Sequence, residues 1–280
     1  MDIYKHRVYL EDFEPNKTHL WIPSDSKDRF DNFTLKEYPD DESVQYYLNR
    51  PVEYKLNNSG FRTPDNFNSE DVGNVFLGDS HTFGIGLHLE HTWSHKLNKV
   101  VGGKFWNLGI GGTGATTHLR ILLGYYKELN IKNIFHYAPF YPRYEFIMNG
   151  KPEVVLLNMY EESWRERYGT FCEESLINLD QRRFTYTTNT LAIKGLAAEL
   201  GINYYVSEWK PKYTEFDGSL RARDFYHYSI LQQHSIYEHF LKMYDKSIYE
   251  KYHRYENFCE GDEMMLYQNF GKIKNTKTIL

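Results

Sequence analysis

Four short apolar runs alternate with segments of helical spacing, and this alternation limits the fold of the chain more than any other feature. The runs favour strands, are bounded by turn residues, and lie at residues 75–77, 104–108, 133–138 and 202–206. Apolar side chains recur at helical spacing over residues 119–129, 193–200 and 237–244, and Gly201 is placed as a C-cap. Strands that alternate with helices predict a parallel sheet covered on both faces, whose ligands bind at the carboxyl ends of the strands.

The length of 280 residues suits one domain with an insertion or extension, or at most two small domains. Residues 1–70 are polar, aromatic and interrupted by prolines, and we predict an extended lead-in that wraps the core. The main domain is predicted over residues 71–250; within it, residues 141–183 fit the alternation poorly and are interpreted as an insertion beside the site. Residues 251–280 are rich in charge and tyrosine and are predicted to form a tail.

Charge and composition argue against several classes of protein. A formal charge of -5, without a lysine or arginine cluster, disfavours a nucleic-acid partner. No run of ~18 apolar residues is present, so no membrane span is expected, and the first residues do not resemble a signal peptide. A cytoplasmic location is the expectation, although a virion-associated protein would have the same features. The two cysteines say little about redox compartment, and the oligomeric state is left open.

A first motif, Val-Phe-Leu-Gly-Asp-Ser-His-Thr-Phe-Gly at residues 75–84, places Ser80 where a strand gives way to a loop or helix. Acyl transfer requires a hydroxyl at the sheet edge and backbone N–H groups that bind a developing oxyanion. The Gly-x-Ser-x-Gly elbow of lipase-type hydrolases is not matched, because Thr82 occupies its last position. Gly-Asp-Ser alone is equally typical of a turn, and its place after an apolar run favours a nucleophile.

A second motif, Asp224-Phe-Tyr-His227, precedes the last helical segment. A catalytic serine needs a base, usually a neutral imidazole whose other nitrogen is held by a carboxylate. A separation of three residues lets one turn supply both partners. In isolation, an Asp-x-x-His pair is more often a helix cap beside a surface histidine.

Together these motifs resemble the SGNH (GDSL) hydrolase family, whose first block is Gly-Asp-Ser and whose last is Asp-x-x-His. Residues 107–113, Asn-Leu-Gly-Ile-Gly-Gly-Thr, resemble the second block, and residues 57–62, Asn-Asn-Ser-Gly-Phe-Arg, resemble the lead-in of many members. The resemblance implies a three-layer α/β/α sandwich with a parallel, flavodoxin-like sheet. It also implies a triad of Ser80, His227 and Asp224, with the backbone N–H groups of Ser80 and Gly112 forming the oxyanion hole.

The sequence departs from the family at the third block, Gly-x-Asn-Asp, whose asparagine supplies a further oxyanion donor. Here the third predicted strand runs into Pro-Phe-Tyr-Pro-Arg143, and no asparagine matches. Either Arg143 supplies the positive field or grips a substrate, or two backbone donors suffice. Alternatively, Arg143 is a surface residue paired with Glu145. Asp79 and His81, which flank the nucleophile, are further candidate substrate-binding residues.

The spacing of the histidines is a weaker indication of function than these motifs. His91 and His95 are four residues apart but lack the His-Glu-x-x-His arrangement, so we expect no metal and no cofactor. The leading prediction is a serine ester hydrolase acting on a small-molecule or glycan ester, with deacetylation of a carbohydrate suggested by aromatic content and family breadth. Two alternatives stay open: an O-acyltransferase on the same residues, and a non-catalytic binding or structural module that retains the fold.

Overall fold

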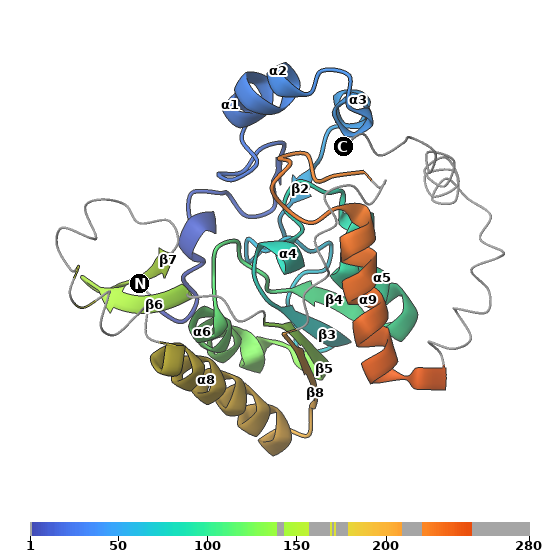
Figure 1. Cartoon of the computed structure of the whole chain (residues 1–280). Coiled ribbons are helices and arrows are strands. Elements are labelled where there is room, and N and C mark those ends of the chain that lie inside the picture. The colour runs from blue at the N-terminus through green and yellow to red at the C-terminus, as the bar shows by residue number, and fades with distance from the viewer. Residues whose placement is uncertain are drawn as a thin grey trace.

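Four parallel strands form the central sheet of the protein (Figure 1). The computed structural model describes residues 2–138, 143–156, 169, 171, 179–208 and 220–247. The strands are β3 (Val72–Leu77), β4 (Lys104–Asn107), β5 (Asn130–Tyr137) and β8 (Asn203–Ser207), and their order in the sheet is β4-β3-β5-β8. Each coincides with one of the four predicted runs, and the predicted parallel sheet is confirmed.

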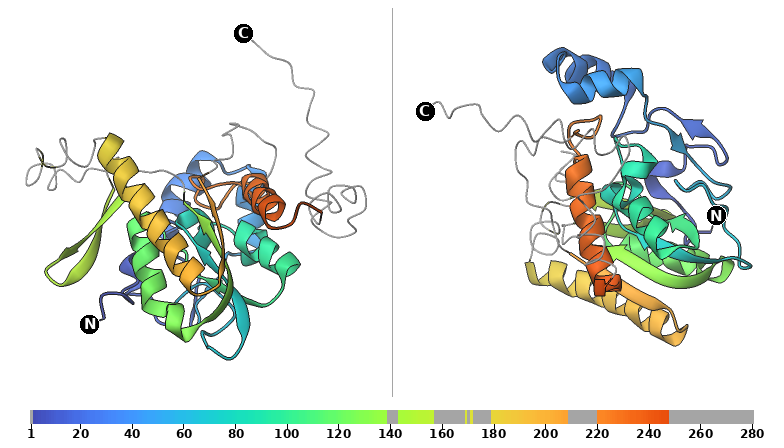
Figure 2. Two further views of the ribbon diagram at one scale, coloured as in Figure 1. Left: turned by 90° about the horizontal axis from the view of Figure 1, so that it is seen from below. Right: turned by 90° about the vertical axis from the view of Figure 1, so that its right-hand side faces the viewer.

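Helices cover both faces of this sheet, as Figures 1 and 2 show. Helices α5 (Trp93–Val101) and α9 (Ile230–Tyr244) pack together on one face, and α6 (Ala115–Tyr125) and α8 (Leu179–Glu199) pack together on the other. Because side chains alternate along a strand, β3 sends Phe76 into the core under α5 and α9, and its neighbours Val75 and Leu77 into the opposite core. The fold is therefore mixed α/β, compatible with three layers.

The predicted helical stripes begin within α6, α8 and α9, but Tyr126, Leu129 and Leu200 lie beyond the ends of α6 and α8. Local signals explain where the helices begin and end. Ser229 and Gln232 form a reciprocal capping box at the start of α9. The Thr92 hydroxyl accepts a hydrogen bond from the backbone N–H of His95 at the start of α5. Gly201 follows α8 with φ +69°, in the left-handed region that glycine adopts without strain, as its predicted role as a C-cap requires.

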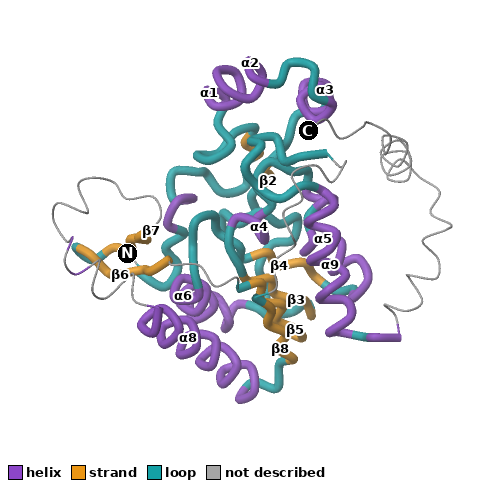
Figure 3. The backbone as a smooth tube through the Cα atoms, in the orientation of Figure 1, coloured by secondary structure: helices purple, strands orange, loops and turns teal. Residues whose placement is uncertain are grey.

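The segment before residue 71 is more helical than predicted. An antiparallel pair, β1 (Thr18–His19) and β2 (Tyr54–Lys55), brackets a helical region. That region comprises α1 (Lys27–Arg29), the π-helical η2 (Phe30–Thr34), α2 (Leu35–Glu37) and α3 (Glu42–Asn49), and the 3₁₀ turn η1 (Val8–Leu10) precedes it. The prolines separate these helices rather than prevent them, because Pro39 and Pro51 follow the ends of α2 and α3. Figure 3 shows the loops that join this region to the sheet.

A β-hairpin stands apart from the sheet (Figure 1). Its strands β6 (Arg143–Met148) and β7 (Lys151–Leu156) meet at Asn149 and Gly150, which both have positive φ as a tight hairpin turn demands. Both strands lie within the predicted insertion. Most of the insertion predicted at 141–183 and the whole tail predicted at 251–280 lie outside the described residues. Among the helices that are described, none combines the length and apolar character needed to cross a membrane.

Buried histidines make stability depend on pH. Burial lowers the pKa of His88, His91 and His118 to about 4, and that of His81 to about 3. The unfolded chain takes up protons on these groups below about pH 6.5, whereas the folded protein does so only near pH 4, so their stabilising effect is full above about pH 6.5 and is lost as the pH falls through this window. We expect a lower urea midpoint at about pH 5 than at about pH 7.5. Equal midpoints would contradict the prediction.

Candidate active site

Ser80 begins the short helix α4 (Ser80–Phe83) directly beyond β3, at the carboxyl edge of the sheet (Figure 1). Asp79 caps this helix, because its Oδ1 atom accepts a hydrogen bond from the backbone N–H of His81 at 3.0 Å. A Cβ atom at Gly78 would lie 2.8 Å from the carbonyl oxygen of Tyr137, so glycine alone permits this turn. The motif thus places its serine where strand order reverses between β3 and β5, the usual ligand site of such sheets.

The second glycine-rich turn lies against this helix. Asn107, at the end of β4, donates to the carbonyl oxygen of Thr82 at 2.8 Å and accepts from the N–H of Gly109 at 2.9 Å. A Cβ atom placed on Gly111 would lie 3.8 Å from the Cβ of Ser80, and Gly112 follows with φ +75°. The structure therefore brings the predicted second block beside Ser80.

Asp224 and His227 are joined as predicted. The Nδ1 atom of His227 lies 2.5 Å from Oδ2 of Asp224, while Oδ1 accepts from the backbone N–H groups of Tyr226 and His227. Burial would raise the pKa of Asp224, but His227 and these backbone donors outweigh it and hold the pKa below its ordinary value. The carboxylate is therefore ionised at neutral pH and orients the imidazole so that Nε2 is left for another partner.

The loop that carries His227 lies close to the helix that carries Ser80. The ring of His81, the residue after Ser80, lies 5.5 Å from the ring of His227, centroid to centroid. Among the described residues, however, no hydrogen bond joins the Ser80 hydroxyl to His227. Catalytic hydrogen bonds are often long without substrate, so the lack of this contact is compatible with a nucleophile–base pair that closes on binding.

An ion pair that the sequence analysis missed holds the Asp224 loop. Arg223 donates through Nε and Nη2 to the carboxylate of Asp25, at 2.7–3.0 Å, and both side chains are only 1% exposed. The Tyr54 hydroxyl donates to Asp25 and accepts from the N–H of Gly86, while Gly86 accepts from the N–H of Arg223 through its carbonyl oxygen. Burial raises the pKa of Asp25 although Arg223 and Tyr54 partly oppose it. Only the position of Arg223 beside Asp224 could have indicated this role.

Phe225, between Asp224 and His227, is strained. Its φ of +58° lies in the left-handed region that a bulky residue rarely adopts. The ring stacks on Tyr38 at 5.1 Å, and the Arg221 guanidinium lies 5.0 Å from its centroid. The strained backbone is thus held by contacts with the N-terminal helical region.

Arg143 contacts the turn that leads into Ser80, and it does not pair with Glu145. Its guanidinium donates to Oδ2 of Asp79 at 2.7 Å and to the carbonyl oxygen of Thr113 at 3.2 Å. Glu145 instead forms a buried, two-point ion pair with Arg120 of α6 at 2.5 and 2.8 Å. The predicted alternative pairing of Arg143 with Glu145 is therefore wrong. Because residues two apart share one face of a strand, both side chains point from β6 toward the sheet edge.

Asp79 and His81, the other candidate substrate-binding residues, are buried. Both carboxylate oxygens of Asp79 have protein partners; burial would raise its pKa, but the backbone N–H of His81 and the Arg143 guanidinium hold it below the ordinary value. His81 stacks on Tyr228 at 3.6 Å, and burial keeps its imidazole neutral. These contacts give both side chains a role in shaping the turn around Ser80.

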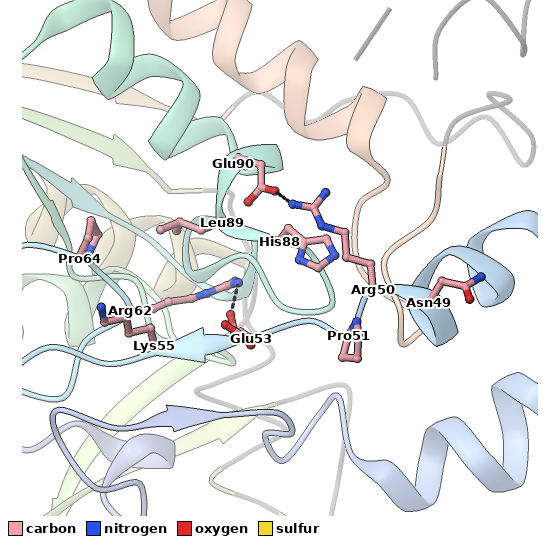
Figure 4. Close-up of a pocket in the computed structure, with 10 residues that line it drawn as sticks. All are labelled: Asn49, Arg50, Pro51, Glu53, Lys55, Arg62, Pro64, His88, Leu89 and Glu90. Carbon is pink, nitrogen blue, oxygen red and sulfur yellow. Dashed lines mark hydrogen bonds and ion pairs between the residues drawn. The ribbon is translucent and has the colours of Figure 1, made fainter. Parts of the chain in front are cut away.

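A cavity of about 480 Å³ lies beside the site rather than at it (Figure 4). Most of its lining residues are polar or charged, among them Arg50, Arg62, His88 and Glu90, and neither Ser80 nor His227 lines it. Arg62 donates to the carbonyl oxygens of Phe83 and Gly84 at the end of α4. The cavity wall therefore supports the helix that begins at Ser80.

Neither a model of a known protein family nor a curated protein sequence matches this chain. Within the described ranges, no group of three or more His, Cys, Asp or Glu residues could hold a metal ion. His91 and His95 belong to different elements, the 3₁₀ turn η3 (Leu89–His91) and α5. What the site can do must therefore be inferred from its own geometry.

The buried pair between Asp25 and Arg223 leads to a stability prediction. Asp25→Ala leaves a buried guanidinium that cannot lose its proton, so we expect unfolding to become easier by about 3–5 kcal/mol. The matched control is Glu90→Ala, which removes the carboxylate of the Arg50–Glu90 pair, with side chains 53% and 34% exposed. That loss should cost only about 0–1 kcal/mol. Urea unfolding measures both changes, and equal losses would contradict the assigned role.

Proposed function

We propose that this protein is a serine ester hydrolase of the SGNH type, acting through Ser80, His227 and Asp224. The observation that carries the proposal is the 2.5 Å contact of Asp224 with His227, on a loop that meets the Ser80 helix at the edge of a parallel sheet. The strand order, second-first-third-fourth along the chain, is that of the flavodoxin-like sheet and supports the proposal. The order of the motifs, Gly-Asp-Ser first and Asp-x-x-His last, supports it independently.

In the proposed reaction, the Ser80 hydroxyl attacks an ester carbonyl while Nε2 of His227 takes up its proton. The protonated imidazole then returns that proton to the departing alcohol, and Asp224 stabilises the imidazolium between the two steps. Water, activated by the same imidazole, releases the acyl group. In this proposal a side chain or the loop moves when substrate binds, so that Nε2 of His227 reaches the Ser80 hydroxyl.

The oxyanion hole of this proposal combines two backbone donors with a cation. The N–H groups of Ser80 and Gly112 would bind the developing negative charge, and Arg143 would supply the positive field that an asparagine supplies elsewhere in the family. Arg143 suits this role because it contacts Asp79 on one side of Ser80 and Thr113 on the other. The ion pair of Glu145 with Arg120 fixes the strand from which Arg143 extends.

A glycan ester is the substrate class that we favour. Tyr226, next to His227, and Tyr38, stacked on Phe225, expose 56% and 41% of their surface. The Arg29 guanidinium lies 5.5 Å from the centroid of the Tyr226 ring. Exposed aromatic faces beside a nucleophile offer stacking surfaces for a sugar ring, and the guanidinium offers hydrogen-bond donors for its hydroxyls.

Replacing the nucleophile tests the function directly. Ser80→Ala should lower the hydrolysis of short-chain nitrophenyl esters more than ~1,000-fold, and Asp224→Asn should lower it ~10,000-fold by favouring the wrong imidazole tautomer. Ser69→Ala removes a hydroxyl from an exposed residue and should leave the rate unchanged. A fluorophosphonate probe should label the wild type and not Ser80→Ala. Equal turnover by the wild type and Ser80→Ala would refute the proposal, and an unlabelled wild type would favour a binding module.

Arg143 can be tested separately. Arg143→Gln removes the charge from the oxyanion hole, so we expect kcat to fall ~100- to 1,000-fold with a smaller change in KM. Arg143→Lys keeps the positive charge but loses the planar set of N–H donors of the guanidinium, and an intermediate kcat is expected. Lys151→Gln removes an exposed charge from the same hairpin and serves as the control. An unchanged kcat in Arg143→Gln would show that the two backbone donors suffice.

A further inference from the structure

A chain of buried hydrogen bonds runs beneath the glycine turn beside Ser80. The Thr113 hydroxyl lies 2.6 Å from the carbonyl oxygen of Ile110 and 3.3 Å from Nε2 of His118. Nδ1 of His118 lies 2.8 Å from Nε2 of His136, and Nδ1 of His136 lies 2.8 Å from the hydroxyl of Tyr204. The chain thus links the turn to α6, β5 and β8, and the proposed reaction does not use its side chains.

Counting protons gives this chain a single direction. A carbonyl oxygen can only accept, so the Thr113 hydroxyl donates its one proton to Ile110 and must accept from Nε2–H of His118. A neutral His118 then accepts at Nδ1 from Nε2–H of His136, whose own Nδ1 accepts from the Tyr204 hydroxyl. Burial lowers the pKa of His118 to about 4 and holds that of His136 well below its ordinary value, which keeps both rings neutral. Both histidines therefore carry their proton on Nε2.

This hydrogen-bond chain ends at the turn that carries Gly112, whose N–H group is a proposed oxyanion donor. The Thr113 hydroxyl closes a loop across Gly111 and Gly112, and the other side of that loop is fixed because the N–H of Ile110 donates to the carbonyl oxygen of Gly78 at 3.1 Å. Two consecutive glycines have little conformational preference of their own, so their N–H groups point consistently only if the loop is closed from outside. The clamp on Thr113 supplies that closure.

We propose that Thr113, His118 and His136 are positioning residues that hold the Gly111–Gly112 turn, and with it the oxyanion donor, through a one-directional hydrogen-bond chain anchored by Tyr204. This inference rests on the proposed function of the turn. It assigns a role to two buried histidines on the strand and helix nearest the site. The third strand, which lacks the family's asparagine, contributes to the oxyanion hole indirectly through His136.

Two measurements test the chain without any enzyme assay. Nitrogen-15 NMR of histidine-labelled protein at neutral pH should show His118 and His136 as neutral Nε2–H tautomers. A proton on Nδ1 of His118 would overturn the proposal, because Thr113 would then donate to His118 and release Ile110. Thr113→Val, which removes the hydroxyl and keeps the shape, should also shift and broaden the amide signals of Gly111 and Gly112. Unchanged amide signals would overturn the proposal as well.

Kinetics test the consequence for catalysis. Thr113→Val should lower kcat ~10- to 100-fold at unchanged KM, and Thr113→Ser, which restores the hydroxyl, should recover most of the rate. Tyr204→Phe, at the far end, should have a smaller effect in the same direction, and Tyr205→Phe, on the opposite face of β8, should have none. Wild-type kcat in Thr113→Val would overturn the proposal. If the wild type itself fails to hydrolyse esters, the proposed function is wrong. The histidine tautomers and the amide signals of Gly111 and Gly112 still decide whether the hydrogen-bond chain holds the turn.

Discussion

The buried ion pair between Asp25 and Arg223 joins segments 198 residues apart and fixes the loop on which the proposed triad depends. Burying two charges is costly, and a buried pair often adds little to stability compared with apolar packing. The Asp25–Arg223 pair matters here because it positions the loop that carries Asp224. Arg223 directly precedes Asp224 in the chain, and its backbone N–H donates to the carbonyl oxygen of Gly86. The N-terminal segment is thus part of the scaffold of the site.

The contacts that hold Arg223 also explain the path of the N-terminal lead-in around the molecule. Tyr54 stands on the short strand β2, and its hydroxyl bridges Asp25 and Gly86. The indole of Trp21 lies 3.8 Å from the Arg223 guanidinium and covers its face. These contacts stabilise the buried arginine, because its N–H groups meet the Asp25 carboxylate and the carbonyl oxygen of Leu20 and its face meets an aromatic ring. The lead-in therefore folds against the loop that carries Asp224 and His227 rather than trailing from it.

The central sheet could be predicted from the sequence because strand and helix periods differ and the apolar runs are sharply bounded. Ser80, Asp224 and His227 could be placed because their motifs are local: each spans a single turn. The partners of Arg143 could not be placed. Its contact with Asp79 depends on a hairpin that folds back across the sheet edge, and sequence proximity favoured Glu145 instead. The contacts of Asp25 and of His136 are likewise set by tertiary packing, on which local spacing carries no information.

The charges around Ser80 favour His227 as the single base of the proposed reaction. The carboxylates of Asp79 and Asp224 are both held ionised, but the first is matched by Arg143 and the second faces His227. His81 lies between them and stays neutral, since burial lowers its pKa to about 3. In the proposed reaction, a charged His81 would oppose the positive charge that develops on His227 when it takes up the proton of Ser80, because their rings are 5.5 Å apart. Burying His81 against Tyr228 removes that opposition, so Asp224 acts on His227 without a competing cation beside it.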